Sequence, residues 1–349
     1  MKKYIISCDW GTTAFRLRLI ETIDYKVISE CISLEGVART YEAWKARGTP
    51  AHEKQGFFID KLKQQMAVLS NQSNMPLEGL NIVISGMASS SIGMVELPYA
   101  TLPFNLDGSQ ANIQLIEADA FFLHKIMLIS GVRSDDDVMR GEETQLIGLI
   151  DLLNLSPNQP YIFILPGTHS KHLYLENNRL VNFHTYMTGE IFNILSNHSI
   201  LKDSIEIETS DNLSNPELAA FKKGVLEANS TGILNSLFKV RTNQLFQKLN
   251  KKENGFYLSG LLIGSELKQL LTESNCQLVL CSGPVSDTSK AMTPGDWLST
   301  GCSELQPPTA AVAVSRTPPC SVNLNALDSR FLSTCWRRFE SVLMLLARV

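Results

Sequence analysis

One pattern occurs twice in this sequence and restricts the folds that the chain can adopt. An apolar strand leads into a loop with Gly11 and Thr12, and an alternating strand, a turn and a third strand follow. The same succession returns about 156 residues later, with Gly167 and Thr168 in the loop. A Gly-Thr pair also suits an ordinary tight turn, but two copies with the same flanking strands weaken that alternative. The repeat predicts an α/β fold of two similar lobes, each with a glycine-threonine hairpin.

Hydrophobic periodicity predicts several further elements. Apolar residues at helical spacing predict one helix over 56–69 and another over 141–153. Buried strands are expected over 80–85 and 277–280. The segment 255–264 consists of small and apolar residues, and we expect it to begin a closely packed helix.

The length of the chain fits a division into lobes. A chain of 349 residues is too long for one ordinary hydrophobic core and suits two lobes of about 150 residues. We place an N-terminal lobe at 1–155 and a C-terminal lobe at 156–290. The tail at 291–349 is atypical, because it lacks Lys, Ile, Tyr and His and contains two Pro-Pro pairs. We interpret it as frameshifted or poorly ordered rather than as a natural linker with a terminal helix.

Charge and hydropathy argue against two classes of partner. The formal net charge is -4, whereas a nucleic-acid binder would show a basic excess. No apolar segment approaches the roughly 18 residues that cross a bilayer. The first apolar segment stops at Asp9, too early for a signal peptide. We therefore expect a cytoplasmic protein without nucleic-acid or membrane partners, and the oligomeric state stays open.

The residues around the first glycine-threonine loop suit phosphate binding. Gly11 lets backbone N–H groups approach a phosphate, and the hydroxyls of Thr12 and Thr13 add donors. Asp9 ends the preceding strand and can hold Mg²⁺ directly or through water, because Mg²⁺ prefers oxygen ligands. Arg16 can neutralise phosphate charge. The alternative is a polar hairpin in which Asp9 caps the turn.

Two adjacent acids, Glu142 and Glu143, open the helix expected over 141–153. Acids at a helix N-terminus complement the helix dipole by about 0.3–1 kcal/mol each, and that explanation alone suffices. A more specific interpretation makes one of them a metal ligand or a general base. Adjacent helical residues point about 100° apart, so we expect only one of the two to face a substrate. The sequence does not decide which one.

The second glycine-threonine loop resembles the first in its chemistry. Gly167 and Thr168 offer a second phosphate-binding loop, and Lys171 is its candidate charge partner. Thr188 stands at the entry of a helix, where it either binds substrate or serves as the N-cap.

Two other short segments follow buried strands, a usual place for substrate-binding groups. The first is Ser85, Gly86 and Met87. The second contains Ser282 and Gly283, which either approach an adenine ring or form a turn.

Six segments carry a resemblance to a known family, and they occur in the order 9–13, 85–87, 137–145, 166–171, 187–190 and 257–264. Together they closely resemble the 2-dehydro-3-deoxygalactonokinase family, also called 2-keto-3-deoxygalactonate kinase, from residue 1 to about 290. The Arg-Gly-Glu-Glu-Thr-Gln and Pro-Gly-Thr-His-Ser-Lys segments are specific, whereas the first loop alone indicates only the wider superfamily.

The resemblance implies an actin/hexokinase/Hsp70-like ATPase fold, with two ribonuclease-H-like lobes and ATP with Mg²⁺ in a cleft between them. The implied reaction is ATP-dependent phosphorylation of the 6-hydroxyl of 2-dehydro-3-deoxy-D-galactonate, a step of bacterial galactonate breakdown. Both glycine-threonine loops would bind phosphates, and Ser282 and Gly283 would lie at the adenosine. We expect Asp9 to be the Mg²⁺ partner.

The resemblance also suggests roles in binding and transfer. Glu142 or Glu143 would accept the proton of the hydroxyl, and Arg140 or Lys171 would bind the carboxylate of the sugar acid. Two alternatives stay open, the first because related superfamily members also carry Gly-Glu-Glu motifs and the second because the tail departs from the family pattern. One is a phosphohydrolase or another phosphotransferase of the same superfamily, and the other is a non-catalytic nucleotide-binding protein.

Overall fold

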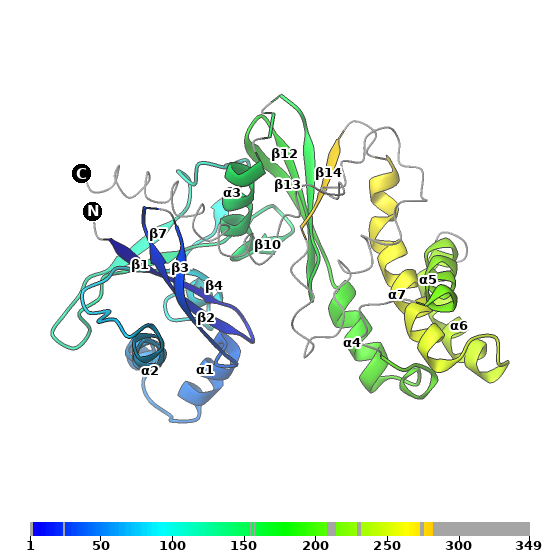
Figure 1. Ribbon diagram of the computed structural model, residues 1–349, viewed down its shortest axis with the longest axis horizontal. Coiled ribbons are helices and arrows are strands. Elements are labelled where there is room, and N and C mark those ends of the chain that lie inside the picture. The colour runs from blue at the N-terminus through cyan, green and yellow to red at the C-terminus, as the bar shows by residue number, and fades with distance from the viewer. Residues whose placement is uncertain are drawn as a thin grey trace. The chain divides into compact units, whose positions relative to one another are not determined.

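The structure is a computed structural model, and it describes residues 3–281 except 24, 154, 157, 208–213, 229–231 and 273–275. The expectations for Ser282, Gly283 and the tail lie outside the described residues. Within them the chain forms two compact units (Figure 1). Of the described residues, unit 1 contains those up to 156 together with 178–182, and unit 2 contains those in 158–177 and 183–281.

Unit 1 is built on a six-stranded sheet. Its strands are β1 (Tyr4–Trp10), β2 (Phe15–Glu21), β3 (Val27–Ser33), β4 (Ile82–Gly86), β7 (Ile113–Ile116) and β8 (Ile126–Ile129). They lie in the order β3-β2-β1-β4-β8-β7. The hairpin strands β1, β2 and β3 are antiparallel, whereas β4 is parallel to both β1 and β8.

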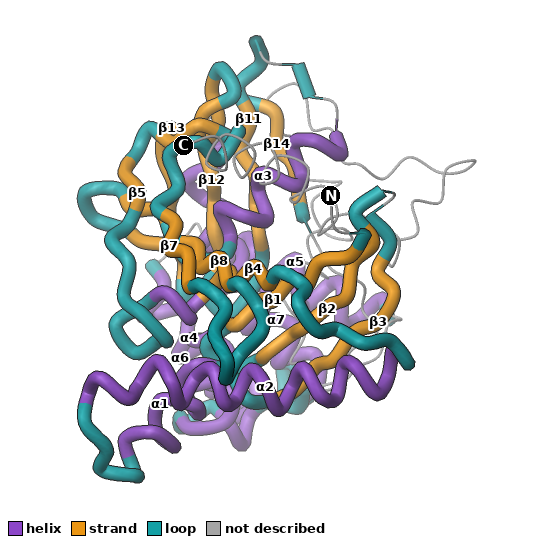
Figure 2. Tube along the Cα trace, turned by 90° about the vertical axis from the view of Figure 1, so that its left-hand side faces the viewer, coloured by secondary structure: helices purple, strands orange, loops and turns teal. Residues whose placement is uncertain are grey.

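The helices and short strands of unit 1 complete this lobe. They are α1 (Val37–Lys45), α2 (Lys54–Ser73), α3 (Glu142–Leu153), β5 (Ala100–Thr101), β6 (Phe104–Asn105), β9 (Val132–Arg133) and β10 (Val138–Met139). Figure 1 and Figure 2 show α1 and α2 on the same side of the six-stranded sheet. The strands β10, β9 and β5 form a separate small sheet.

The core of unit 1 follows directly from hydrophobic periodicity. Along β2 the alternating residues Phe15, Leu17 and Leu19 are fully buried, and Arg18 and Ile20 on the opposite face are buried as well. The side chains that α2 buries recur at helical spacing and pack into the same core: Phe57, Phe58, Leu62, Met66 and Leu69. The helix predicted over 56–69 and the strand predicted over 80–85 are therefore confirmed.

Unit 2 repeats the strand order of unit 1. Its strands are β11 (Tyr161–Leu165), β12 (Ser170–Glu176), β13 (Arg179–Tyr186) and β14 (Gln277–Leu280). The order β13-β12-β11-β14 matches β3-β2-β1-β4, and β14 is parallel to β11 as β4 is to β1. The first residues of β13, which belong to unit 1, pair with β6. The prediction of two similar α/β lobes is confirmed.

The described part of unit 2 has four α-helices, and two of them pack closely. They are α4 (Thr188–His198), α5 (Asn215–Ala228), α6 (Ile233–Leu245) and α7 (Lys251–Leu267). A Cβ atom on Gly224 of α5 would lie 2.2 Å from the Tyr257 carbonyl oxygen, and one on Gly260 of α7 would lie 2.1 Å from the Phe221 carbonyl oxygen. Only glycine allows this backbone contact.

The start of α7 corrects one prediction. The segment 255–264 lies inside the helix rather than at its beginning. The helix begins at a capping box, in which Asn250 accepts from the Glu253 N–H group and Glu253 accepts from the Asn250 N–H group. This short polar signal precedes the apolar segment by a full turn.

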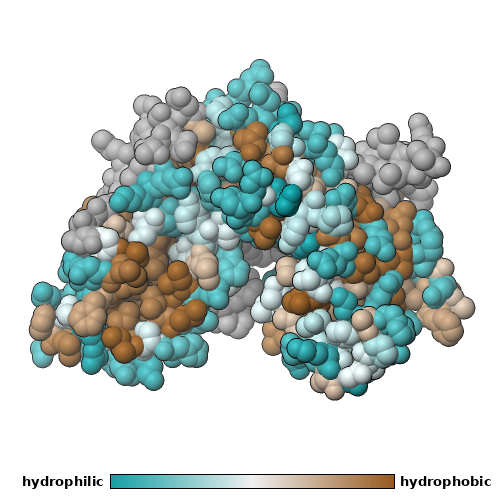
Figure 3. Space-filling view, turned by 180° about the vertical axis from the view of Figure 1, so that it is seen from behind, coloured by the Kyte–Doolittle hydropathy of each residue, from teal (hydrophilic) through white to brown (hydrophobic). Residues whose placement is uncertain are grey.

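Unit 2 also exposes large apolar side chains on its helices. On α6, Leu234 is 84% exposed and Phe238 is 55% exposed, and on α4 Ile191 and Ile194 are exposed. Figure 3 shows hydrophobic residues gathered in patches on the face seen from behind. Among the described residues no helix has both the length and the apolar character that crossing a bilayer demands.

Candidate functional site

The first glycine-threonine loop joins β1 to β2 and leaves donors at its apex. Thr12 and Thr13 are exposed, and their N–H groups donate to no acceptor in the described part of the chain. The carbonyl groups of the loop point the other way. Gly11 accepts from the Val37 N–H group at 2.9 Å, and Thr12 accepts from the Ala38 N–H group at 3.1 Å. The start of α1 therefore fixes the loop while the loop donors stay available.

Gly36 makes this contact between loop and helix possible. It is the N-cap residue of α1, and a Cβ atom on it would lie 2.4 Å from the Thr12 carbonyl oxygen and 2.6 Å from Thr13 Cα. Any larger residue would push the helix away from the loop. Nothing in the residue pattern singles out this glycine until the helix is located.

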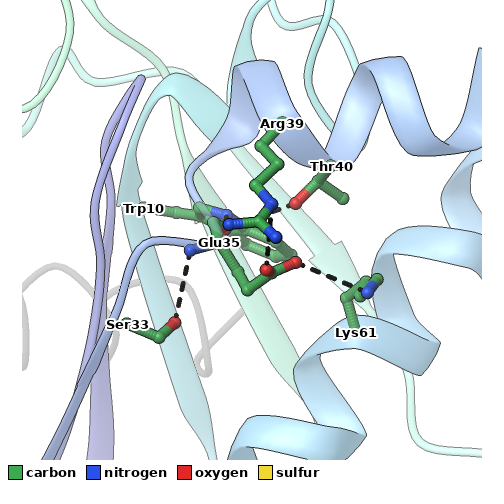
Figure 4. A network of polar contacts seen from close by, with 6 residues as sticks. All are labelled: Trp10, Ser33, Glu35, Arg39, Thr40 and Lys61. Atoms are coloured by element: carbon green, nitrogen blue, oxygen red, sulfur yellow. Dashed lines mark hydrogen bonds and ion pairs between the residues drawn. The ribbon is translucent and has the colours of Figure 1, made fainter.

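Glu35 anchors the same junction (Figure 4). Its carbonyl group accepts from Trp10 Nε1 at 3.0 Å and from Thr40 Oγ1 at 3.3 Å. Its carboxylate pairs with Arg39 at 3.2 Å and with Lys61 of α2 at 3.4 Å. One residue thus connects β1, α1 and α2 beside the loop.

Asp9 lies next to the loop at the end of β1. Its Oδ2 accepts from Arg16 Nη1 at 3.0 Å, and both side chains are about one-quarter exposed. In the parallel pair of β1 and β4, Asp9 faces Ser85, and a Cβ atom on Gly86 would lie 3.4 Å from Asp9 Oδ1. Met87 follows at the start of a 3₁₀ helix, Met87–Ser89. The structure thus brings Asp9, Arg16 and the segment 85–87 together.

The N-terminus of α3 reaches the same place. A Cβ atom on Gly141, at φ 107°, would lie 3.4 Å from Gly86 Cα. The next two residues carry the paired acids. Glu142 is half-buried, and its carboxylate accepts from the Arg140 N–H group at 3.1 Å. The acids predicted to serve catalysis therefore lie beside the segment that adjoins Asp9.

Glu143 is the buried member of the pair, at 2% exposure. Its two oxygens accept from the Gly141 N–H group at 2.9 and 2.8 Å, and Oε1 also accepts from Thr144 Oγ1 at 3.1 Å. Burial, with a further contribution from the Glu142 charge, raises the pKa of Glu143 to about 8. The surrounding N–H and hydroxyl donors oppose that rise without cancelling it.

Arg140 is held by protein groups. Its Nη1 donates to the Ser89 carbonyl oxygen at 2.6 Å and to Ser89 Oγ at 2.7 Å, and Nη2 donates to the Leu97 carbonyl oxygen at 3.1 Å. Its guanidinium carbon lies 3.9 Å from the centre of the Tyr99 ring. These contacts connect Arg140, two residues before α3, to Ser89 and to the loop that contains Leu97.

The second glycine-threonine loop joins β11 to β12 in unit 2 and has the same construction. Thr168 is exposed, and its N–H group donates to no acceptor among the described residues. The Glu190 N–H group of α4 donates to the Thr168 carbonyl oxygen at 3.0 Å. A Cβ atom on Gly189 would lie 2.5 Å from the Gly167 carbonyl oxygen. Gly189 therefore has in unit 2 the role that Gly36 has in unit 1.

Two residues predicted near this loop are buried. Lys171 is 5% exposed, and its Nζ donates to Thr185 Oγ1 at 2.5 Å. Thr188 is 6% exposed, and its hydroxyl donates to Glu266. The interpretation of Thr188 as an N-cap is wrong, because Met187 is the N-cap residue and no side chain caps the helix. The sequence offered no signal for Glu266, which is 78 residues from Thr188.

Among the described residues, Asp9 is the candidate partner for Mg²⁺ beside the first loop. No group of three or more His, Cys, Asp or Glu side chains in this part could hold a metal ion. Mg²⁺ usually keeps several waters and binds one or two carboxylates together with substrate phosphates. Asp9 fits that pattern, because Arg16 engages Oδ2 and Oδ1 lies beside Gly86.

The fold and this site define a class of protein. Two units repeat one strand order, and each carries a glycine-threonine loop held by a helix start. A crystal structure described as a 2-dehydro-3-deoxygalactonokinase protein from Sinorhizobium meliloti matches with a TM-score of 0.69 and 27% identity, over 97% of this chain and 96% of that chain. The protein has the actin/hexokinase-like ATPase fold.

Sequence comparison then identifies the family. The profile of the 2-keto-3-deoxy-galactonokinase family matches residues 9–286. A Rhizobium meliloti (strain 1021) protein named as a probable 2-dehydro-3-deoxygalactonokinase, DgoK1, is 33% identical over 281 residues, which are 78% of this chain and 81% of that protein. The 2-dehydro-3-deoxygalactonokinase of Escherichia coli (strain K12) is 33% identical over 193 residues, 54% of this chain and 61% of its own length. The chain belongs to the 2-keto-3-deoxy-galactonokinase family and is a phosphotransferase.

Proposed function

We propose that the protein transfers the γ-phosphoryl group of ATP to the 6-hydroxyl of 2-dehydro-3-deoxy-D-galactonate. Family membership supports the substrate class. The observation that carries the proposal is the pair of loops whose threonine N–H groups have no acceptor in the described part, while a helix start holds the loop carbonyls. Oriented, unpartnered N–H groups at a tight turn bind anions such as phosphate. Thr12, Thr13 and Thr168 would donate to phosphate oxygens.

Asp9 is the proposed partner of Mg²⁺. When bound, Mg²⁺ neutralises charge on the β- and γ-phosphates and so stabilises the transition state. Asp9 would hold the ion directly or through water, and Arg16 would keep the carboxylate oriented. We assign Arg16 this role because its guanidinium donates to Asp9.

Glu142 is the proposed proton acceptor of the sugar hydroxyl. A general base must come within hydrogen-bond reach of the proton that it takes. Glu142 is half-buried and accessible, whereas Glu143 is 2% exposed with both oxygens directed at Gly141. Glu143 would instead cap the start of α3 and set the position of its neighbour.

The segment 85–87 is the proposed contact for the sugar acid, because it adjoins both Asp9 and Gly141. Arg140 would act by holding the loop after Met87 in place. Lys171 and Thr188 are buried in unit 2, and we assign them to the support of the second loop. A cytoplasmic location and the absence of nucleic-acid and membrane partners stay predictions.

A kinase assay with purified protein tests this function. Release of ADP should require ATP, Mg²⁺ and 2-dehydro-3-deoxy-D-galactonate together, and the product should carry phosphate on the 6-oxygen. E142Q should lower kcat by about 100-fold, the scale of lost general-base catalysis, while E143Q should lower it far less. ATP hydrolysis without the sugar acid would favour a phosphohydrolase, and ATP binding without turnover would favour a non-catalytic nucleotide binder. Either result would refute the proposed reaction.

A further inference from the structure

A buried carboxylate lies behind the second glycine-threonine loop. Glu266, in the last turn of α7, is 4% exposed. Its Oε1 accepts from Ser170 Oγ at 2.7 Å and from His172 Nε2 at 2.9 Å, and its Oε2 accepts from Thr188 Oγ1. A buried carboxylate is costly unless donors surround it. The three donors therefore hold fixed positions around this one side chain.

The three donors belong to the two segments that enclose the loop. Ser170 and His172 open β12 directly after the loop. Thr188 opens α4, and the following residue, Gly189, touches the backbone of Gly167. Glu266 therefore joins the strand that leaves the loop to the helix start that holds its carbonyls.

The His172 ring depends on the same carboxylate. The side chain is fully buried, and its Nδ1 has no hydrogen-bond partner within the described residues. Its Nε2 donates to Glu266, and its ring centre lies 4.5 Å from that of Tyr186. Loss of the acceptor would leave both ring nitrogens buried without a partner in this part of the chain, which is unfavourable.

Unit 1 holds its own loop by an independent set of contacts of the same kind. There Glu35 binds Trp10 of β1, Arg39 of α1 and Lys61 of α2, and it directly precedes Gly36 (Figure 4). In each unit an acidic residue thus ties the start of the loop-holding helix to the neighbouring elements. The two acids come from different places in the chain, Glu35 before the helix and Glu266 from another helix.

We propose that Glu266 is a positioning residue for phosphoryl transfer, which fixes α4 through Thr188 and thereby orients the Thr168 N–H group toward ATP phosphates. This inference rests on the proposed function. Glu266 acts through Thr188, Ser170 and His172 and does not touch ATP itself. The substitution T188V removes the hydrogen bond from residue 188 to Glu266 and keeps the side-chain shape, whereas T188S keeps that hydrogen bond.

Steady-state kinetics of the full chain test the proposal with matched variants. T188V and E266Q should raise KM for ATP about tenfold, the scale expected when a supporting contact of a binding group is lost. KM for the sugar acid should not change, and T188S should keep the wild-type KM for ATP. S196A is the control, since it also removes a buried hydroxyl from α4 but one that donates to Phe192 within the helix. It should leave KM for ATP unchanged.

Hydrogen exchange of residues 166–171 gives a second measurement that needs no turnover. T188V and E266Q should exchange these amides faster than the wild type, and S196A should not. Equal exchange and equal KM for ATP across all variants would overturn the positioning role while the kinase assignment stands. An inactive wild-type protein would instead refute the proposed function, and the exchange measurement would still decide whether Glu266 orders the loop.

Discussion

The substitution E143Q tests whether the buried acid at the start of α3 makes stability depend on pH. Glu143 is 2% exposed, and burial raises its pKa to about 8 from an ordinary value of 4.5. At pH values in this interval the folded state holds the proton more tightly than the unfolded state, so stability falls as pH rises. The glutamine side chain introduced by E143Q would stay neutral at every pH and keep one oxygen for the Gly141 N–H group.

The expected magnitude follows from the two pKa values. Relative to low pH, ionisation of Glu143 disfavours the folded state by the equivalent of about 1.0 pH unit at pH 5.5 and about 3.4 pH units at pH 8.5. At 1.36 kcal/mol per unit, the difference between these two pH values is about 3 kcal/mol. The wild type should therefore lose about 3 kcal/mol of unfolding free energy over this range through Glu143 alone. E143Q should lose none of that part.

Urea denaturation followed by tryptophan fluorescence measures this difference. Among the described residues Trp10 and Trp44 both lie in unit 1, and replacing Trp297 and Trp336 by Phe restricts the signal to that unit. E142Q is a graded control, because it removes the neighbouring charge but not the burial, and it should reduce the pH dependence only in part. Equal pH dependence in the wild type and E143Q would refute the reasoning.

Three further predictions concern the site. G36A and G189A should each lower the free energy of unfolding by about 3 kcal/mol, because the added Cβ atom would lie 2.4 or 2.5 Å from a backbone oxygen. G56A is the control in the same melting experiment: its Cβ atom would meet nothing within 4 Å, so this variant should be neutral or stabilising. D9N should lower kcat/KM by about 100-fold and raise the Mg²⁺ concentration for half-maximal activity; an unchanged Mg²⁺ titration would exclude Asp9 as the metal partner. R140M should raise KM for the sugar acid more than KM for ATP, because Arg140 holds the loop beyond residue 87, and an effect on ATP alone would contradict that role.

The sequence predicted those strands and helices whose apolar residues recur with a regular period within the element itself. Apolar residues alternate along the first part of β2 and recur at helical spacing along α2, so both elements were identified from the residues alone. The helix α1 was missed; it spans only nine residues and buries only Val37 and Thr40. The two-residue strands β5, β6, β9 and β10 show no period at all.

Some residues of the candidate site were also predicted from local sequence patterns, and others were not. Asp9 and the two loops follow strand ends, so strand prediction located them. The supporting residues depend on tertiary contacts, as Glu266 meets Ser170 across 96 residues of sequence. Lys171 was predicted as the charge partner of the second loop, and its burial could not be anticipated, because a lysine in a strand after a polar loop gives no sign of facing inward. Side-chain direction at a strand start is set by register, which becomes predictable only once the pairing is known.

Both glycine-threonine loops are proposed to bind the phosphates of ATP. A crystal structure with a non-hydrolysable ATP analogue, Mg²⁺ and the sugar acid tests this proposal directly. We expect phosphate oxygens within about 2.7–3.2 Å of the N–H groups of Thr12 or Thr13 and of Thr168, and the 6-hydroxyl within hydrogen-bond reach of Glu142. Phosphates bound away from either loop would contradict the account.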